Sequence, residues 1–146
     1  MVSSSKQRTH SLFTSFVFAF RGVWYAFREE RNFRVQVLYG LIVASLMMLL
    51  QPPAGLSLLC LLTVVLVMAA ELVNSALERA VDLACSERHP LAGEAKDMAA
   101  AAVMLVSFTS ALVVLWTVAG ELSSEALLGI GGLLFLIVGE RRRATS

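Results

Sequence analysis

Two long stretches without a charged side chain constrain this chain more than any other feature. One separates Arg34 from Glu71 and the other separates Asp97 from Glu121. Helices of a water-soluble domain carry charges on their outer face, so runs of this length indicate helices surrounded by lipid. A composition of 58% hydrophobic and 16% charged residues over 146 residues agrees. We therefore predict an integral membrane protein of the all-α class, folded as one domain over residues 1–146.

The order of apolar and polar segments predicts where the helices lie. In residues 13–27, large apolar side chains recur at helical spacing beside Arg21 and Arg28, which is typical of an amphipathic helix in the membrane interface. Packing of that helix on a bundle is the alternative. Residues 35–50, 56–70 and 98–120 are expected to be three transmembrane helices of a polytopic bundle. Gln51, Pro52, Pro53 and Gly55 predict a tight turn between the first two.

A fourth apolar run follows the predicted core. Residues 126–139 are uncharged and precede Arg141, Arg142 and Arg143. We expect a fourth, C-terminal hydrophobic helix in an extension over residues 121–146, outside a core over 13–120. A helix lying along the membrane is the alternative. Four spans would place the N-terminus, the polar segment 79–96 and the Arg triplet on the cytoplasmic side, as the positive-inside rule expects.

Polar side chains form a stripe where the second predicted span ends. Glu71, Asn74, Glu78 and Asp82 follow the apolar run directly. At ~100° per residue they fall within an arc of roughly 80° on a helix, so they share one face. Carboxylates at membrane depth usually face a cation or a water-filled site. Oxygen ligands suit Mg²⁺, which commonly binds together with phosphates, and Lys96 beside Asp97 could meet those phosphates.

Simpler roles for the same residues remain open on these patterns alone. Glu30 could pair with Arg31 or Arg34, and the stripe could be an interfacial helix end paired with Arg79 or Arg88. His89 could be an ordinary loop residue. No phosphate-binding glycine motif is present. Cys60 and Cys85 lack metal-ligand spacing and are expected to be free thiols, and no surface for nucleic acid is indicated.

Three sequence blocks resemble one family of bacterial enzymes. ELVNSALERAVDL and ERHPLAGEAKDMAAAAV strongly resemble the signature of the small integral-membrane diacylglycerol kinases and undecaprenol kinases, and AFRGVWYAFREERNFRV resembles the N-terminal motif of that family. The resemblance covers residues 13–120 and implies an ATP-dependent lipid kinase of the bacterial inner membrane. It further implies three core helices behind an amphipathic helix and a homotrimer whose active sites lie between subunits. From the position of the polar segment, the active site is expected to face the cytoplasm. The run after Gly120 extends past the usual family end.

The resemblance also implies roles for individual residues. Glu71 would be the catalytic base and, with Trp24 and Arg34, would contact the lipid substrate. Glu30 and Glu78 would hold Mg²⁺, while Asn74 and Asp82 would support the site. The expected ATP-binding residues are Glu30, Glu78, Glu87, His89, Lys96 and Asp97.

Two questions about function stay open on the sequence. Diacylglycerol, giving phosphatidic acid, is the expected substrate, and undecaprenol, giving undecaprenyl phosphate, is the alternative. Both lipids offer one hydroxyl at the interface and an apolar tail. A rival of another class is a non-enzymatic membrane subunit whose acids line an ion path. A path would need acids through the middle of the bilayer, whereas these acids lie at one end, so the kinase is favoured.

Overall fold

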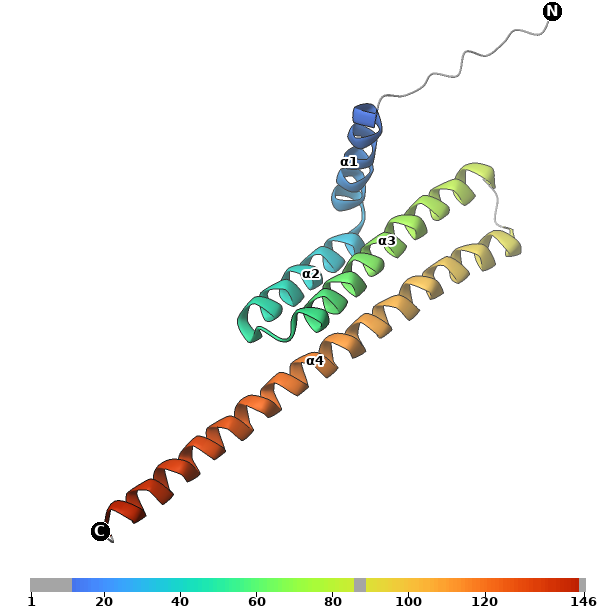
Figure 1. Cartoon of the computed structure of the whole chain (residues 1–146). Coiled ribbons are helices and arrows are strands. Elements are labelled where there is room, and N and C mark those ends of the chain that lie inside the picture. The colour runs from blue at the N-terminus through green and yellow to red at the C-terminus, as the bar shows by residue number, and fades with distance from the viewer. Residues whose placement is uncertain (1–11, 86–88, 145–146) are drawn as a thin grey trace, which may run out of the picture.

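The computed structural model describes residues 12–85 and 89–144, with side chains to Ser124 and at Leu128. Four helices follow in order: α1 (Leu12–Glu29), α2 (Arg31–Leu50), α3 (Ala54–Ala84) and α4 (Pro90–Ala144). α2 and α3 form a hairpin, α4 runs antiparallel along α3, and α1 leaves the bundle at a steep angle (Figure 1). The predicted all-α bundle is therefore confirmed for the described part of the chain.

Three helices are long and apolar enough to cross a membrane. They are Arg31–Leu50, Ala54–Ala84 and the first part of α4, Pro90–Ser124. Large apolar side chains cover their outer faces, and Leu41, Leu115 and Trp116 are examples that are more than half exposed. Lipid is the solvent in which such a surface is stable. The three predicted spans are confirmed, each with extra turns at its polar end.

The junction between α1 and α2 lies at one residue. Glu30 has an extended backbone (φ −100°, ψ 116°) between the two helices. The charged residues from Glu29 to Arg34 therefore do not all belong to α1. Arg31 already begins α2, so the cluster straddles the junction. The Arg34 guanidinium donates to the carbonyls of Phe27 (3.3 Å) and Arg28 (2.9 Å) in the last turn of α1, where helix carbonyls generally lack intrahelical partners.

The turns at the two ends of the hairpins follow from their residues. Gln51 is left-handed (φ 48°) and its N–H bonds the carbonyl of Met47 (3.1 Å), which ends α2 before Pro52. At the other end, α4 begins at Pro90, where a missing N–H does no harm. Gly93 follows three residues later and lies inside α4 without interrupting it.

The expected fourth helix is not a separate element. Residues 126–139 are helical, but they continue α4, which extends past the α2–α3 turn (Figure 1). No proline lies beyond Pro90, and the Ser123 and Ser124 hydroxyls bond the carbonyls of Gly120 and Glu121 (2.8 Å each) without interrupting the helix. The structure therefore corrects the prediction of a separate C-terminal helix. That this portion crosses the membrane stays a prediction.

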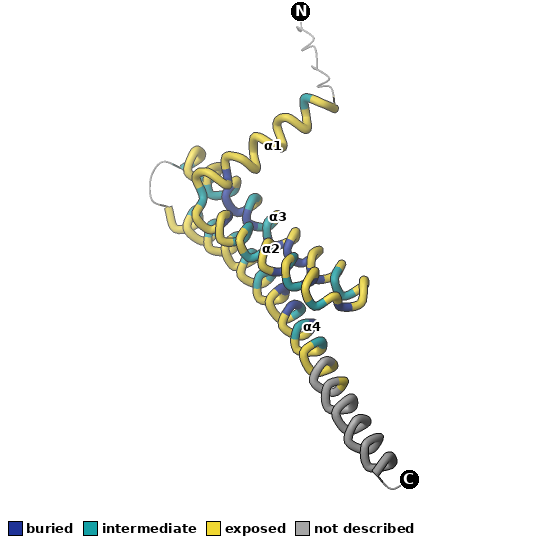
Figure 2. The backbone as a smooth tube through the Cα atoms, turned by 90° about the vertical axis from the view of Figure 1, so that its left-hand side faces the viewer, coloured by how far each residue is buried: buried dark blue, intermediate teal, exposed yellow. Residues whose placement is uncertain are grey.

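A small core joins the three long helices. Its buried apolar members are Val43 and Met47 of α2, Cys60 and Val64 of α3, and Val114 of α4. Figure 2 shows buried residues along the inner side of α3, while α1 is mostly exposed and has one buried residue, Ala26, near its end. Small core volume and large outer surface are expected when lipid covers the remainder.

Hydroxyl groups bond the helices across this core. Ser110 of α4, fully buried, donates to Thr63 of α3 (3.0 Å), which leaves Tyr39 of α2 to donate to Ser110 (3.1 Å). Cys60 donates to Thr117 (3.4 Å) one layer further along. Polar groups in hydrocarbon need such partners, so these bonds fix the register of α2, α3 and α4.

Candidate active site

Glu71 is the buried centre of the predicted stripe. It lies on α3 with 4% of its surface exposed, directly after the charge-free part of that helix. The side chain of Asn32, in the first turn of α2, is hydrogen-bonded to it, and the carboxylates of Glu30 and Glu78 lie near enough to act on it electrostatically. The structure therefore gathers three of the predicted acids from two places in the sequence.

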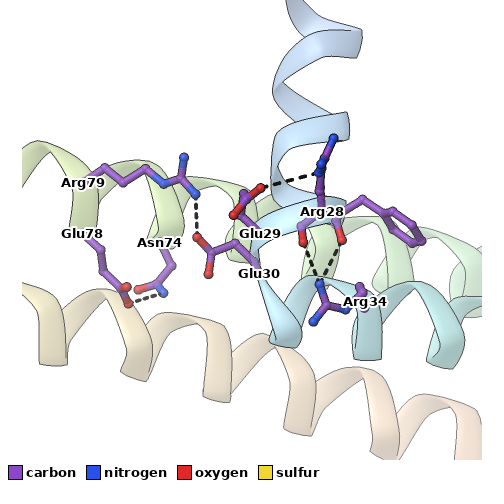
Figure 3. Close-up of polar contacts among 8 residues, drawn as sticks. Arg28, Glu29, Glu30, Arg34, Asn74, Glu78 and Arg79 are labelled. Atoms are coloured by element: carbon purple, nitrogen blue, oxygen red, sulfur yellow. Dashed lines mark hydrogen bonds and ion pairs between the residues drawn. The ribbon is translucent and has the colours of Figure 1, made fainter.

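Asn74 and Glu78 continue the stripe toward the polar end of α3. Asn74 donates its Nδ2 hydrogen to Glu78 Oε1 at 2.8 Å, and Figure 3 shows the two side chains turned toward each other. The other amide atom, Oδ1, is buried and has no hydrogen-bond partner among the described residues. A buried acceptor without a donor in the protein is the arrangement expected where a ligand or cation completes the site.

Glu30 has a partner that the sequence did not suggest. Its Oε1 accepts a hydrogen bond from the Arg79 guanidinium at 2.8 Å, across a sequence separation of 49 residues (Figure 3). Arg31 and Arg34, the partners considered from the sequence, do not pair with Glu30 within the described part of the chain, and Arg34 instead bonds the end of α1. The contact fixes the α1–α2 junction against α3 and holds Glu30 beside the stripe.

Asp82 and Lys96 form an ion pair between α3 and α4. Asp82 lies one helical turn beyond Glu78, so the pair places Lys96, the predicted nucleotide-binding lysine, at the polar end of the stripe. His89 and Asp97 are exposed, and neither is joined to the acidic stripe by a hydrogen bond or ion pair within residues 12–85 and 89–144. His89 Nδ1 accepts from the Leu91 N–H (3.3 Å) at the start of α4. Glu87 lies outside the described residues.

Two apolar cavities flank α1 beside the cluster. One, of about 480 Å³, lies between α1 and α3 and includes Gly22, Ala26, Ser75 and Arg79 in its walls. The other, of about 330 Å³, is lined by Trp24 and neighbouring apolar side chains of α1, α2 and α3. Trp24 also stacks on Phe27, with ring centroids 6.3 Å apart. The predicted lipid-contacting residue Trp24 is thus placed at an apolar space.

The donor chemistry of the cluster fits a magnesium ion. No three His, Cys, Asp or Glu side chains of the described residues are gathered closely enough to hold a metal by themselves. Mg²⁺ does not require such a cage, because it usually takes one or two carboxylates together with substrate phosphates and water. Glu30 and Glu78 supply carboxylates, and the unpartnered Asn74 Oδ1 is a further oxygen.

Sequence reasoning missed Asn32 and considered Arg79 only as a partner of the stripe, not of Glu30. Asn32 follows Glu30 by two residues, and Arg79 follows Glu78 directly. An α1–α2 junction placed at Glu30 would have put Asn32 in the first turn of α2. Nothing local to Arg79 marks it as the partner of Glu30, since the contact depends on how α2 and α3 pack.

Membrane-spanning helices with a buried carboxylate cluster at one polar end define a polytopic helical membrane protein with an oxygen-donor site. The family model for prokaryotic diacylglycerol kinase matches residues 17–118. The chain belongs to this family of lipid kinases, which confirms the resemblance in its sequence.

Individual relatives agree with this family. A diacylglycerol kinase of Synechocystis sp. is 42% identical over 104 residues, covering 70% of this chain and 59% of that protein. An undecaprenol kinase of Bacillus subtilis is 34% identical over 108 residues (74% of this chain, 88% of that protein), and a diacylglycerol kinase of Haemophilus influenzae is 38% identical over 97 residues (66% and 81%).

Proposed function

We propose that this protein transfers the γ-phosphate of ATP to the hydroxyl of 1,2-diacylglycerol, giving phosphatidic acid. The observation that carries the proposal is the position of Glu71. Its carboxylate is buried where the apolar part of a membrane-spanning helix ends, it is hydrogen-bonded by Asn32, and two further acids, Glu30 and Glu78, lie near it. A lipid hydroxyl lies at headgroup height while ATP arrives from water. A base at that depth can bring the two reactants together.

Each acid of the cluster has a separate task in the proposed reaction. Glu71 accepts the proton of the lipid hydroxyl as the bond between that oxygen and the γ-phosphorus forms and the bond to the bridging oxygen of ATP breaks, releasing ADP. Glu30 and Glu78 hold Mg²⁺, with Asn74 fixing Glu78 through its 2.8 Å hydrogen bond. When bound, the ion supplies neutralisation of phosphate charge, which is the main requirement of phosphoryl transfer.

The nucleotide binds, in this proposal, at the start of α4. Lys96 neutralises phosphate charge, and Asp82 keeps its ammonium group at the stripe through their ion pair. Asp97 and His89, both exposed, are accessible to ATP from water. Glu87 belongs to the same proposed set.

The lipid enters beside α1, whose exposed aromatic face suits the membrane interface. The apolar cavities on either side of α1 can take an acyl chain, one of them lined by Trp24. Arg34 contributes by holding the end of α1 in place through its two carbonyl contacts. An active site facing the cytoplasm of the bacterial inner membrane is supported by the Lys and Arg residues at this end of the bundle. A homotrimer is proposed on family resemblance.

The test is transfer of labelled γ-phosphate from Mg·ATP to diacylglycerol and to undecaprenol, side by side in mixed micelles. We expect labelled phosphatidic acid, and a loss of at least about 100-fold in Glu71→Gln, because a positioned base contributes that much or more. Glu121→Gln, the same change near the other end of the bundle, is the matched control and should retain activity. Gel filtration of each variant checks its folding.

Undecaprenol is the second candidate because the Bacillus subtilis relative carries that name and is matched over 88% of its length. Labelling of undecaprenol alone would replace diacylglycerol as the substrate and leave the kinase chemistry standing. If neither lipid is labelled by folded protein, the proposed function is wrong, and ion flux through vesicles containing the protein becomes the next measurement.

A further inference from the structure

The positively charged side chain of Arg79 is bound to Glu30, the carboxylate that the proposed reaction needs for Mg²⁺. Its guanidinium lies 2.8 Å from Glu30 Oε1, with 52% of the Arg79 side chain and 31% of the Glu30 side chain exposed. Two neighbouring arginines have other partners: Arg34 bonds the carbonyls that end α1, and Arg28 pairs with Glu29 at 3.8 Å. Of the described arginines, Arg79 is the one that neutralises Glu30.

We propose that Arg79 is the resident counter-ion of Glu30 and competes with the divalent cation for that carboxylate. The inference rests on the proposed function only in taking Glu30 as a cation ligand. Arg79 acts through Glu30, so it is a positioning residue. Its presence raises the concentration of divalent cation that is needed to occupy the site.

Magnitudes decide between this role and a simple tether. If Arg79 served only to hold Glu30 in place, its loss would weaken cation binding by no more than about fivefold, the range of a half-exposed ion pair. Loss of Arg79 leaves the charge of Glu30 uncompensated, and a unit negative charge about 6 Å from a divalent cation strengthens its binding by roughly tenfold even with the dielectric constant of water. Release of the Glu30 carboxylate therefore outweighs the loss of tethering, and removal of Arg79 should strengthen cation binding.

The geometry leaves room for such an exchange. The Arg79 contact uses one carboxylate oxygen of Glu30, and Figure 3 shows the second oxygen turned away from the guanidinium. The pair is not sealed inside the protein, so both partners can be rehydrated as the cation arrives. A buried pair would resist this exchange, because breaking it would leave an uncompensated charge.

The experiment titrates Mn²⁺ into the purified full chain in detergent without nucleotide or lipid, with free Mn²⁺ followed by its electron paramagnetic resonance signal. Arg79→Gln is expected to bind Mn²⁺ about three- to tenfold more tightly than the wild type. Arg79→Lys, which keeps the charge, should stay within about twofold. Arg28→Gln removes an arginine from a neighbouring exposed pair and should leave the affinity unchanged.

A double-mutant cycle tests whether the effect passes through Glu30. In a Glu30→Gln background, Arg79→Gln should change Mn²⁺ affinity by less than about twofold. Equal or weaker Mn²⁺ binding by folded Arg79→Gln overturns the inference. A change that persists without Glu30 also overturns it.

Failure of this inference is distinguishable from failure of the proposed function. The former is read from Mn²⁺ affinity, and the latter from lipid labelling by the wild-type protein. Misfolding of Arg79→Gln would weaken binding, which is the opposite of the expected sign, and Arg79→Lys provides a folded reference.

Discussion

Glu29 and Glu30 are neighbours in the sequence with different surroundings. Glu29 ends α1, is exposed, and makes a loose pair with Arg28 at 3.8 Å. Glu30 lies at the α1–α2 junction, is partly buried, and is held by Arg79 near Glu71. The break in the helix between them directs one carboxylate toward water and the other toward the cluster.

This difference predicts opposite results for one substitution at two adjacent positions. Glu30→Gln should lower lipid phosphorylation at least about 100-fold at low Mg²⁺, because the site loses a metal carboxylate. Glu29→Gln should stay within about twofold of the wild type. Initial rates across a Mg²⁺ series provide the measurement. Equal losses in the two variants would assign the effect to charge at the junction and would argue against metal binding by Glu30.

The sequence pattern predicted part of the carboxylate cluster, namely the residues contributed by α3. Glu71, Asn74, Glu78 and Asp82 were predicted to share a helix face, and α3 confirms that arrangement. The pairing of Glu30 with Arg79 could not be predicted, because 49 residues separate them and their contact depends on the packing of α1, α2 and α3. The same holds for Lys96 with Asp82, which lie on different helices.

At the scale of elements, hydroxyl bonds and one close approach set how the helices meet. Gly40 of α2 lies so near α3 that a Cβ there would come within 2.9 Å of Val64 Cγ1. Beyond this contact, Ser110 bonds both Tyr39 and Thr63, so one side chain of α4 joins all three long helices. Spans were predictable from hydropathy, but this register was not, since any of several serines and threonines could have faced inward.

Ser110→Ala should destabilise the bundle by about 1 kcal/mol, because it leaves the Tyr39 and Thr63 hydroxyls short of a partner in the membrane. Thr109→Ala is the matched control. Thr109 is exposed and its hydroxyl bonds only a carbonyl of its own helix, that of Leu105 (2.9 Å). We expect a change of less than about 0.5 kcal/mol there. Reversible unfolding in mixed micelles gives both values, and equal destabilisation would contradict the interhelical role of Ser110.

At the scale of the whole molecule, the length of α4 separates the chain into a site-bearing bundle and a projecting helix. At ~1.5 Å per residue, its 55 residues extend about 80 Å, well beyond a hydrocarbon core of about 30 Å. The prediction of a separate helix over residues 126–139 rested on the lack of charge in that run and on the charged residues around it. The segment after Gly120 contains no proline, and α4 continues through its Ser and Glu residues, so the pattern of charge was a poor guide to the end of the helix.

The bundle should work without the projecting part of α4. The cluster and its partners lie at the opposite end of the bundle from the α2–α3 turn, past which α4 extends, and the family match ends at residue 118. A chain ending after Ser124 should therefore phosphorylate lipid within about twofold of the full-length rate, measured in mixed micelles. It should also unfold within about 1 kcal/mol of the full chain, since the buried contacts of α4, at Ser110, Val114 and Thr117, remain. A large loss of activity with unchanged folding would show that residues 125–146 act on the site, and would give the extension a function that the bundle alone does not require.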